Sequence, residues 1–124
     1  MRVAITGSAG LIGGIVYDHL AELGHDVIGI DRPYSDWLEA GRNTEDENAR
    51  NRVEIEMDLT MISDEELMAT LEDVECIIHL AADANPSNDD DSMIRNNIEP
   101  TTAVFRCAKL AQVNRVIVAS SGLA

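Results

Sequence analysis

The sequence contains very little positive charge. Lys109 is its only lysine, and nine lysines and arginines together face 23 aspartates and glutamates, for a formal net charge of −14. A general DNA- or RNA-binding protein needs a basic surface that displaces counterions. Docking on an anionic membrane surface requires basic residues as well. The charge balance therefore argues against nucleic acid and against a membrane as partners.

The acidic residues are spread along the whole chain, with local clusters at 45–47 and 89–91. An acidic tail or a metal cluster would concentrate the charge. Dispersed carboxylates instead favour a solvated surface in high salt, where repulsion between like charges is screened. In composition the chain resembles the proteins of halophilic archaea. We interpret Asp89-Asp90-Asp91 as a solvated loop, and we predict no metal site.

Long apolar runs and a cysteine pattern are also lacking. No stretch approaches the roughly 18–20 apolar residues of a membrane span, and the apolar run at 3–5 is too short for a signal peptide. Cys76 and Cys107 do not have the spacing of a metal or redox pair, and two cysteines are too few for a disulfide scaffold. We expect two buried thiols in a reducing cytoplasm.

The length of 124 residues fits one domain, in which strand-like and helix-like segments alternate. Short apolar or alternating segments predict five strands, at 2–6, 27–30, 53–57, 76–81 and 115–119. Near-continuous apolar strands between helices predict a parallel sheet covered on both faces. We therefore expect a doubly wound α/β (Rossmann) fold with strand order 3-2-1-4-5, in which ligands bind at the carboxyl ends of the strands.

The helical segments follow from apolar spacing and capping residues. The first helix should place one apolar face toward the sheet and end at Gly24, a C-cap glycine; that face carries Ile12, Ile15, Val16, Leu20 and Leu23. A capping box at 63–66 predicts a short helix to about Leu71. A long helix is expected over 92–112, kinked or restarted at Pro100. Residues 41–51 are predicted as a surface loop.

The first strand ends in a glycine pattern, GxxGxxG, formed by Gly7, Gly10 and Gly13. The first glycine allows a tight turn, the second allows a close approach of the backbone to a pyrophosphate, and the third allows close packing of helix on sheet. The helix N-terminus favours phosphates. A purely structural turn is the alternative. The cofactor contacts predicted here are Gly7, Ala9, Gly10, Leu11, Ile12 and Gly13.

The second strand ends at Asp31, 18 positions after Gly13. An acid at about this distance hydrogen-bonds a ribose 2′-OH and repels a 2′-phosphate, which favours NAD over NADP. The next residue, Arg32, could stack on adenine or accept a phosphate. Asp31 could alternatively be a turn residue before Pro33.

With these motifs the chain resembles the N-terminal part of the extended short-chain dehydrogenase/reductases, the NAD-dependent epimerase/dehydratase family. Residues 6–13 are similar to its TGxxGxxG. Four further stretches resemble family motifs in the same order: Asp58-Leu59, His79-Leu80-Ala81-Ala82, Asn97 (with Pro100 where glycine is usual) and Val118-Ala119-Ser120-Ser121. The resemblance implies an adenine contact for Asp58 and Leu59, and contacts to the rest of the cofactor for Leu80, Ala81, Ala82 and Asn97. It implies that Ser121 is the catalytic serine.

Several of these residues also have structural interpretations. Asp58 could cap the turn after its strand, and Asn97 could be an ordinary polar residue of a helix. His79 fits a packed strand residue better than a catalyst. Ser121 could belong only to a strand-to-loop turn.

The resemblance implies a mechanism in which a tyrosine, assisted by a lysine four residues later, removes a proton while hydride passes to NAD. Tyr17 is followed by Ala21 and Tyr34 by Leu38 at that spacing, so neither can be this tyrosine. We expect residues 1–124 to be an NAD(P)-binding Rossmann domain that is truncated before the Tyr-x-x-x-Lys helix and the substrate-binding region, and that is inactive by itself.

The predicted function is therefore the NAD-binding part of an epimerase, dehydratase or dehydrogenase acting on a sugar or nucleotide sugar. A non-catalytic NAD-binding regulatory or sensor module is the alternative, and an α/β domain without a dinucleotide is a weaker one. The resemblance also implies a homodimer that pairs through the 92–112 helix. From the cysteine content and the short apolar runs we expect the protein in the cytoplasm.

Overall fold

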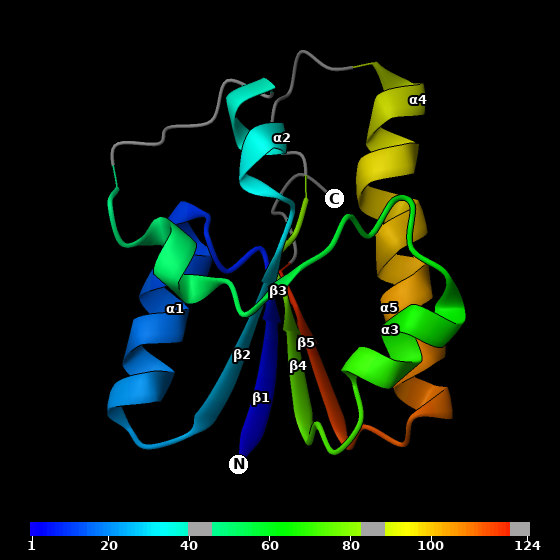
Figure 1. The fold of residues 1–124 in the computed structure, drawn as a ribbon. Coiled ribbons are helices and arrows are strands. Elements are labelled where there is room, and N and C mark those ends of the chain that lie inside the picture. The colour runs from blue at the N-terminus through cyan, green and yellow to red at the C-terminus, as the bar shows by residue number, and fades with distance from the viewer. Residues whose placement is uncertain (40–45, 83–88, 120–124) are drawn as a thin grey trace.

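The computed structural model describes residues 1–39, 46–82 and 89–119 (Figure 1). Its strands form one all-parallel sheet in the order β3-β2-β1-β4-β5. The strands are β1 (Arg2–Thr6), β2 (Asp26–Asp31), β3 (Ile55–Glu56), β4 (Cys76–His79) and β5 (Arg115–Val118). This confirms the doubly wound fold and its strand order. The carboxyl ends of all five strands therefore meet at one edge of the sheet.

Helices cover both faces of the sheet, which Figure 1 shows edge-on. Helix α1 (Leu11–Glu22) lies on one face, and α3 (Asp64–Thr70) and α5 (Glu99–Leu110) lie on the other. Because neighbouring residues of a strand point to opposite faces, β1 contributes to two cores. Val3 and Ile5 pack on the α1 side. Ala4 packs on the side of α3 and α5, with Leu67 and Val104.

The face that α1 turns to the sheet agrees only in part with the one expected, since Val16 and Leu20 pack against the core but the other three residues do not. Ile12, Ile15 and Leu23 are 64%, 65% and 62% exposed. The buried residues of α1 are Gly13 and Gly14. Because Gly13 and Gly14 have no side chains, this side of α1 can pack closely against the glycine turn and against Arg52. Val16, Tyr17 and Leu20 then complete the contact with the sheet.

The ends of the helices were predicted more accurately than the buried face of α1. Gly24 has φ +88°, and the N–H groups of Gly24 and His25 bond to the carbonyls of Ala21 and Leu20, which closes α1 as a C-cap glycine does. At the start of α3, the Ser63 hydroxyl accepts the N–H of Glu66 at 3.2 Å. Helix α3 ends at Thr70, next to the expected Leu71.

Three strands are shorter than predicted, β5 by a single residue, and a helical turn overlaps the end of the predicted loop. β3 comprises only Ile55–Glu56, although the N–H groups of Glu54 and Met57 also bond to carbonyls of β2. Residues Ala49–Arg52 form a 3₁₀ helix, η1. β4 ends at His79: the N–H of Leu80 bonds to both the carbonyl and the hydroxyl of Thr6, and that of Ala81 bonds to the hydroxyl.

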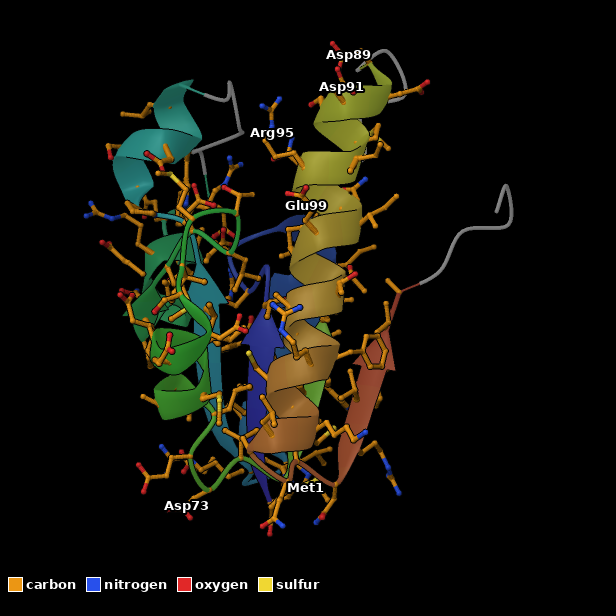
Figure 2. All side chains as sticks on the ribbon, turned by 90° about the vertical axis from the view of Figure 1, so that its right-hand side faces the viewer. Met1, Asp73, Asp89, Asp91, Arg95 and Glu99 are labelled. Carbon is orange, nitrogen blue, oxygen red and sulfur yellow. The ribbon has the colours of Figure 1, made fainter. Side chains whose placement is uncertain are left out.

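The long helix is a stack of three segments, seen from the side in Figure 2. α4 (Asp90–Met93) is followed by a π-helical turn, η2 (Ile94–Ile98), and then by α5. Pro100 occupies the first turn of α5, where its missing N–H is tolerated, so the predicted restart is confirmed. The stack begins before Ser92 because the Asp89 carboxylate accepts the N–H of Ser92 at 2.8 Å.

Two further properties concern the described residues as a whole. None of their helices has the length and apolarity to cross a membrane. Cys76 and Cys107 are free and buried, and burial raises the pKa of both thiols. The two cysteines therefore act as small apolar core residues, as predicted.

Candidate functional site

The turn after β1 requires glycine at its first position. Gly7 has φ +75°, and its N–H donates to the carbonyl of Ile30 at 2.8 Å. A Cβ at this position would lie 2.9 Å from the backbone nitrogen of Ala81. Both the backbone conformation and the contact therefore exclude a side chain. The glycine turn is thus tied to β2 on one side and to the segment after β4 on the other.

The other two glycines have different surroundings. A Cβ at Gly13 would lie 2.0 Å from the carbonyl oxygen of Gly7, so the helix could not pack against the turn. A Cβ at Gly10 would meet only that same oxygen, at 3.3 Å. Packing thus explains Gly13, whereas the space beside Gly10 is otherwise open. This is the arrangement expected where a ligand approaches the backbone.

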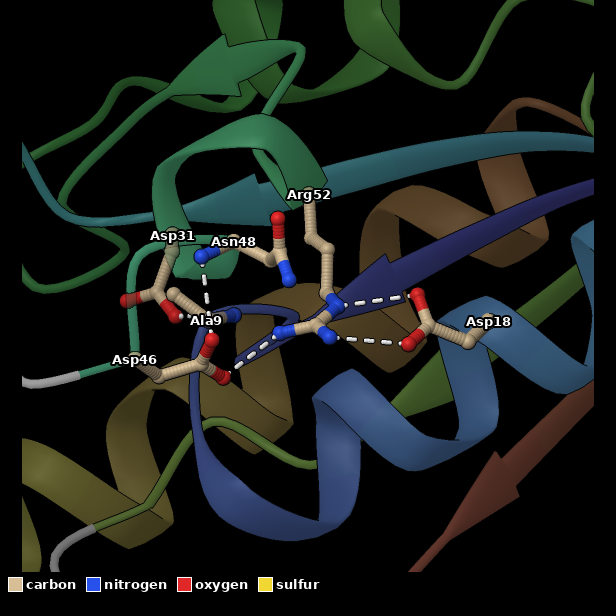
Figure 3. A network of polar contacts seen from close by, with 6 residues as sticks. All are labelled: Ala9, Asp18, Asp31, Asp46, Asn48 and Arg52. Atoms are coloured by element: carbon tan, nitrogen blue, oxygen red, sulfur yellow. Dashed lines mark hydrogen bonds and ion pairs between the residues drawn. The ribbon is translucent and has the colours of Figure 1, made fainter.

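Asp31 joins the end of β2 to the glycine turn (Figure 3). One carboxylate oxygen accepts the N–H of Ala9 at 2.9 Å, and the other accepts the N–H of Arg32 at 2.8 Å. The residue is only 8% exposed. A carboxylate has about four lone-pair positions, so one acid can accept several hydrogen bonds at once. Asp31 thus orients the turn, and it brings a negatively charged hydrogen-bond acceptor to the edge of the sheet beside it.

Thr6, at the end of β1, connects the turn to the end of β4. Its hydroxyl oxygen accepts the N–H groups of Leu80 at 3.0 Å and Ala81 at 3.1 Å, and it lies 2.7 Å from Nδ1 of His79. The other ring nitrogen of His79 lies 2.9 Å from the hydroxyl of Thr101 on α5. His79 is 3% exposed, and burial lowers its pKa. It is the packed strand residue that was predicted, but sequence reasoning missed both of its threonine partners.

Asp58 and Leu59 follow β3 at the same edge of the sheet. One oxygen of Asp58 accepts both the N–H and the hydroxyl of Thr60, at 2.9 and 2.7 Å. Asp58 therefore caps the turn after the strand, and Leu59 packs partly against the core. The implied contact of both residues with adenine stays a prediction.

The remaining predicted residues lie around the same edge, with one exception. Asn97 is half-buried in the π turn, where its side-chain amide lies 3.7 Å from the sulfur of Met93. Leu11 and Ile12 are strongly exposed at the start of α1. Ala82 is exposed after β4. Ser121 lies outside the described residues, so its predicted role as the catalytic serine stays a prediction.

A charged network beside the glycine turn was not predicted at all. The Arg52 guanidinium binds both carboxylate oxygens of Asp18 at 2.8–2.9 Å and one oxygen of Asp46 at 2.8 Å (Figure 3). The space over Gly14 lets it lie against α1, since a Cβ there would be 3.2 Å from Nη1. Arg52 thereby attaches η1 to α1 and lowers the pKa of Asp18. No local pattern marks the pairing of Arg52 with Asp18, because the two residues are 34 positions apart.

A pocket of about 440 Å³ opens on the other side of β3, and it contains none of the predicted site residues. The ring of Tyr34 lies in it under the Arg50 guanidinium, 4.2 Å from the centroid. Nε1 of the buried Trp37 donates to the carbonyl of Arg32 at 2.7 Å, which attaches α2 (Tyr34–Glu39) to the end of β2. The glycine turn, not this pocket, is therefore the candidate functional site.

The glycine turn and its neighbours fit an anionic dinucleotide. The first N–H groups of a helix have no partners within the helix and carry partial positive charge. The first turn of α1 contains no acidic residue that would oppose a phosphate. Beside these groups lie the open space at Gly10 and the carboxylate of Asp31, which can accept sugar hydroxyls.

Comparison with known proteins agrees with this geometry. The sequence model of the NAD dependent epimerase/dehydratase family matches residues 3–124. The chain is 35% identical to the UDP-glucose 4-epimerase of Mycolicibacterium smegmatis and 30% identical to the L-arabinose 1-dehydrogenase (NAD(P)(+)) of Haloferax volcanii. These matches cover 98% and 97% of this chain, but only 39% and 41% of the two relatives.

A solved structure shows the same similarity. MoeE5 in complex with UDP-glucose and NAD superposes with a TM-score of 0.74 at 27% identity, over 98% of this chain and 37% of MoeE5. That protein binds a nucleotide sugar together with NAD. The chain thus spans about two fifths of the length of the proteins it matches.

Proposed function

Because this chain belongs to the NAD-dependent epimerase/dehydratase family, we propose that residues 1–124 are the NAD-binding part of an enzyme that acts on a sugar or nucleotide sugar. NAD is the cofactor of this family. The observation that carries the proposal is the open space at Gly10, next to a turn that Asp31 holds through the N–H of Ala9.

Each part of NAD has a group of residues suited to hold it. The pyrophosphate would lie at the turn and at the N–H groups of Leu11 and Ile12, since the N–H of Gly10 donates to the carbonyl of Gly7 at 3.0 Å. Asp31 would accept ribose hydroxyls, and its charge would oppose the 2′-phosphate of NADP. The resemblance assigns the other contacts to Arg32, Asp58, Leu59, Leu80, Ala81, Ala82 and Asn97.

Bound NAD supplies a hydride acceptor and donor, which is chemistry that no protein side chain provides. By family resemblance, the Ser121 hydroxyl would hydrogen-bond the reacting oxygen of the sugar. Residues 1–124 contain no Tyr-x-x-x-Lys pair. We therefore propose that the 124-residue chain binds NAD but does not turn over a substrate.

The names of the relatives define the range of substrates to test. One is a UDP-glucose 4-epimerase and the other an L-arabinose 1-dehydrogenase. By family resemblance, both activities would pass a hydride between a sugar carbon and a nicotinamide cofactor, so they would use the same kind of cofactor site. UDP-glucose and L-arabinose are therefore the first substrates to assay with the chain.

Calorimetric titration of NAD and NADP against the wild-type chain tests the cofactor proposal. We expect NAD to bind more tightly than NADP. In Gly10→Asp, NAD binding should be lost, because the new carboxylate fills the open space and repels the pyrophosphate. Equal weak binding by wild type and variant would contradict the proposal. Steady NADH production by the purified chain with any sugar would contradict its inactivity.

We also propose that the chain pairs with a second copy through the stack of η2 and α5. Ile94, Ile98 and Phe105 are 44%, 59% and 49% exposed on this stack. Burying such side chains is favourable by about 25 cal/mol per Å² of apolar surface. Sedimentation should show a dimer that Phe105→Asp weakens and that Leu23→Asp, on α1, leaves intact. A sharp monomer at all concentrations would contradict the pairing.

A further inference from the structure

His79 lies between two threonine hydroxyls that come from different layers of the fold. Thr6 is on β1, and its hydroxyl lies 2.7 Å from Nδ1 of His79. Thr101 is on α5, and its hydroxyl lies 2.9 Å from Nε2. All three side chains are wholly or partly buried. Each hydrogen bond between them therefore has a definite donor, which the other bonds of the hydroxyls identify.

The bonds of Thr101 determine which ring nitrogen carries the proton. A hydroxyl has two acceptor positions and one proton. The hydroxyl of Thr101 donates its proton to the carbonyl of Asn97, so its contact with Nε2 of His79 requires a proton on that nitrogen. In a neutral ring Nδ1 is then unprotonated and accepts the hydroxyl proton of Thr6, whose oxygen accepts the N–H of Ala81 and shares that of Leu80 with the Thr6 carbonyl.

The remaining bonds follow from this assignment. The proton of a neutral ring is on Nε2, which donates to the hydroxyl of Thr101. That hydroxyl donates in turn to the carbonyl of Asn97 at 2.6 Å. Every donor in the series thus faces an acceptor. Burial lowers the pKa of His79, which agrees with a neutral ring.

We propose that His79 is a positioning residue of the dinucleotide site: as a neutral ring protonated on Nε2, it links the segment beside the glycine turn to the π turn that carries Asn97. This inference rests on the proposed function. The side chains of Thr6, His79 and Thr101 together form the hydrogen-bond relay. At one end it holds Leu80 and Ala81, whose backbone packs against Gly7. At the other end it holds the carbonyl of Asn97.

The π turn explains why such a link is needed. Its backbone bonds run from residue i to i−5, as from Glu99 to Ile94, so the turn is wider and less regular than an α-helix. π turns are frequent at functional sites. Pro100 follows directly and donates no backbone bond. The side-chain bond from Thr101 to the carbonyl of Asn97 adds a contact across the junction between this turn and α5.

Thr101→Val and Thr101→Ser form a matched pair of variants for the test. Valine has the shape of threonine but no hydroxyl, whereas serine keeps the hydroxyl. We expect Thr101→Val to weaken NAD binding about five- to tenfold, the effect of one neutral hydrogen bond. Thr101→Ser should stay within about twofold of wild type. Equal NAD affinities for folded Thr101→Val and wild type would overturn the positioning role.

Two measurements on the chain without NAD separate this inference from the proposed function. The ¹⁵N shifts of the His79 ring at neutral pH should show a proton on Nε2 only, and a proton on Nδ1 would overturn the relay. Amide exchange at Leu80 and Ala81 should be faster in Thr101→Val than in Thr101→Ser, and equal exchange would overturn the coupling. Should the wild-type chain bind no NAD, the proposed function and the positioning role both fail. The ¹⁵N shifts of the His79 ring and the amide exchange rates of Leu80 and Ala81 would then still show whether the hydrogen-bond relay exists.

Discussion

The carboxylate of Asp31 accepts the backbone N–H of Ala9 at 2.9 Å, so the acid at the end of β2 holds the turn that follows β1. The residue proposed to recognise the ribose therefore also shapes the proposed pyrophosphate site. Its second oxygen accepts the N–H of Arg32. Changes at this position should consequently affect stability and cofactor choice together.

Asp31→Asn tests this double role. Asparagine keeps one acceptor oxygen, and its amide nitrogen would face one of the two backbone N–H donors. The free energy of unfolding should fall by about 1–3 kcal/mol, the cost of a buried group without its partner. NAD affinity should fall about tenfold, with a smaller loss for NADP because the charge opposing its 2′-phosphate is removed. Urea denaturation and calorimetry measure these effects; Asp36→Asn, on α2, is the control. An unchanged ratio of the two affinities would contradict the assignment.

Gly13→Ala and Gly10→Ala should separate folding from binding. The new Cβ at position 13 would lie 2.0 Å from the Gly7 carbonyl oxygen, so we expect a loss of about 3 kcal/mol in unfolding free energy. At position 10 the same contact is 3.3 Å, so the loss should stay below about 1 kcal/mol. NAD affinity should nevertheless fall about tenfold in Gly10→Ala. Thermal unfolding measures the stability of the two variants, and NAD titration measures their affinity. Similar stabilities of Gly13→Ala and Gly10→Ala would contradict the different roles of the two glycines.

Arg52→Gln should reduce stability in a way that depends on pH. The guanidinium lowers the pKa of Asp18, so this stabilisation is present above the ordinary carboxyl pKa and disappears as the pH falls through the lowered value. Because the Asp18 side chain is 50% exposed, the pair should contribute less than about 1 kcal/mol. Unfolding of wild type, Arg52→Gln, Asp18→Asn and the double variant gives the coupling. A stability difference that persists at the lowest pH would contradict it.

Tyr17 should ionise late in an alkaline titration. Burial, and then the hydrogen bond to Glu54, raises its pKa from 10.0 to about 12. Since the folded pKa is the higher one, the stabilisation is complete below about pH 10 and is lost between about pH 10 and 12. Absorbance of the phenolate should show a late phase that Tyr17→Phe removes. Glu54→Gln should move that phase to lower pH, and a phase unchanged by both variants would show the assignment to be wrong.

Salt should stabilise the chain overall. At a net charge of −14, raising KCl from about 0.1 M to 1 M shortens the Debye length from about 10 Å to 3 Å and screens repulsion among the carboxylates. The melting temperature should therefore rise with KCl. Replacing Glu65 and Glu72 by glutamine should make the rise smaller. A melting temperature that falls with KCl would show that attraction in pairs such as Arg52–Asp18 outweighs the repulsion.

Sequence reasoning succeeded where the determinants are close together in the chain. The cap at Ser63, the C-cap at Gly24 and the restart at Pro100 all follow from local patterns. The strand order instead follows from the alternation of strands and helices along the chain. It was only partly right about the buried face of α1, because periodicity identifies apolar positions but not which side of the helix approaches the sheet. Val16 and Leu20 pack as expected. Ile12 and Ile15 fit the period but are exposed, since the glycines at 13 and 14 bring a neighbouring side of the helix closer.

By itself the sequence determined the elements, the glycine turn and the acid at the end of β2, since turns, caps and strand ends depend on neighbouring residues. Only the tertiary structure decided which groups these residues meet. Thr6 and His79 are 73 positions apart, and they bond because β1 and β4 pair in parallel with these two residues in register. Asp31 reaches Ala9 for the same reason, since β1 and β2 are also parallel neighbours. Parallel pairing brings strand ends from distant parts of the chain to one edge, and the candidate site lies there.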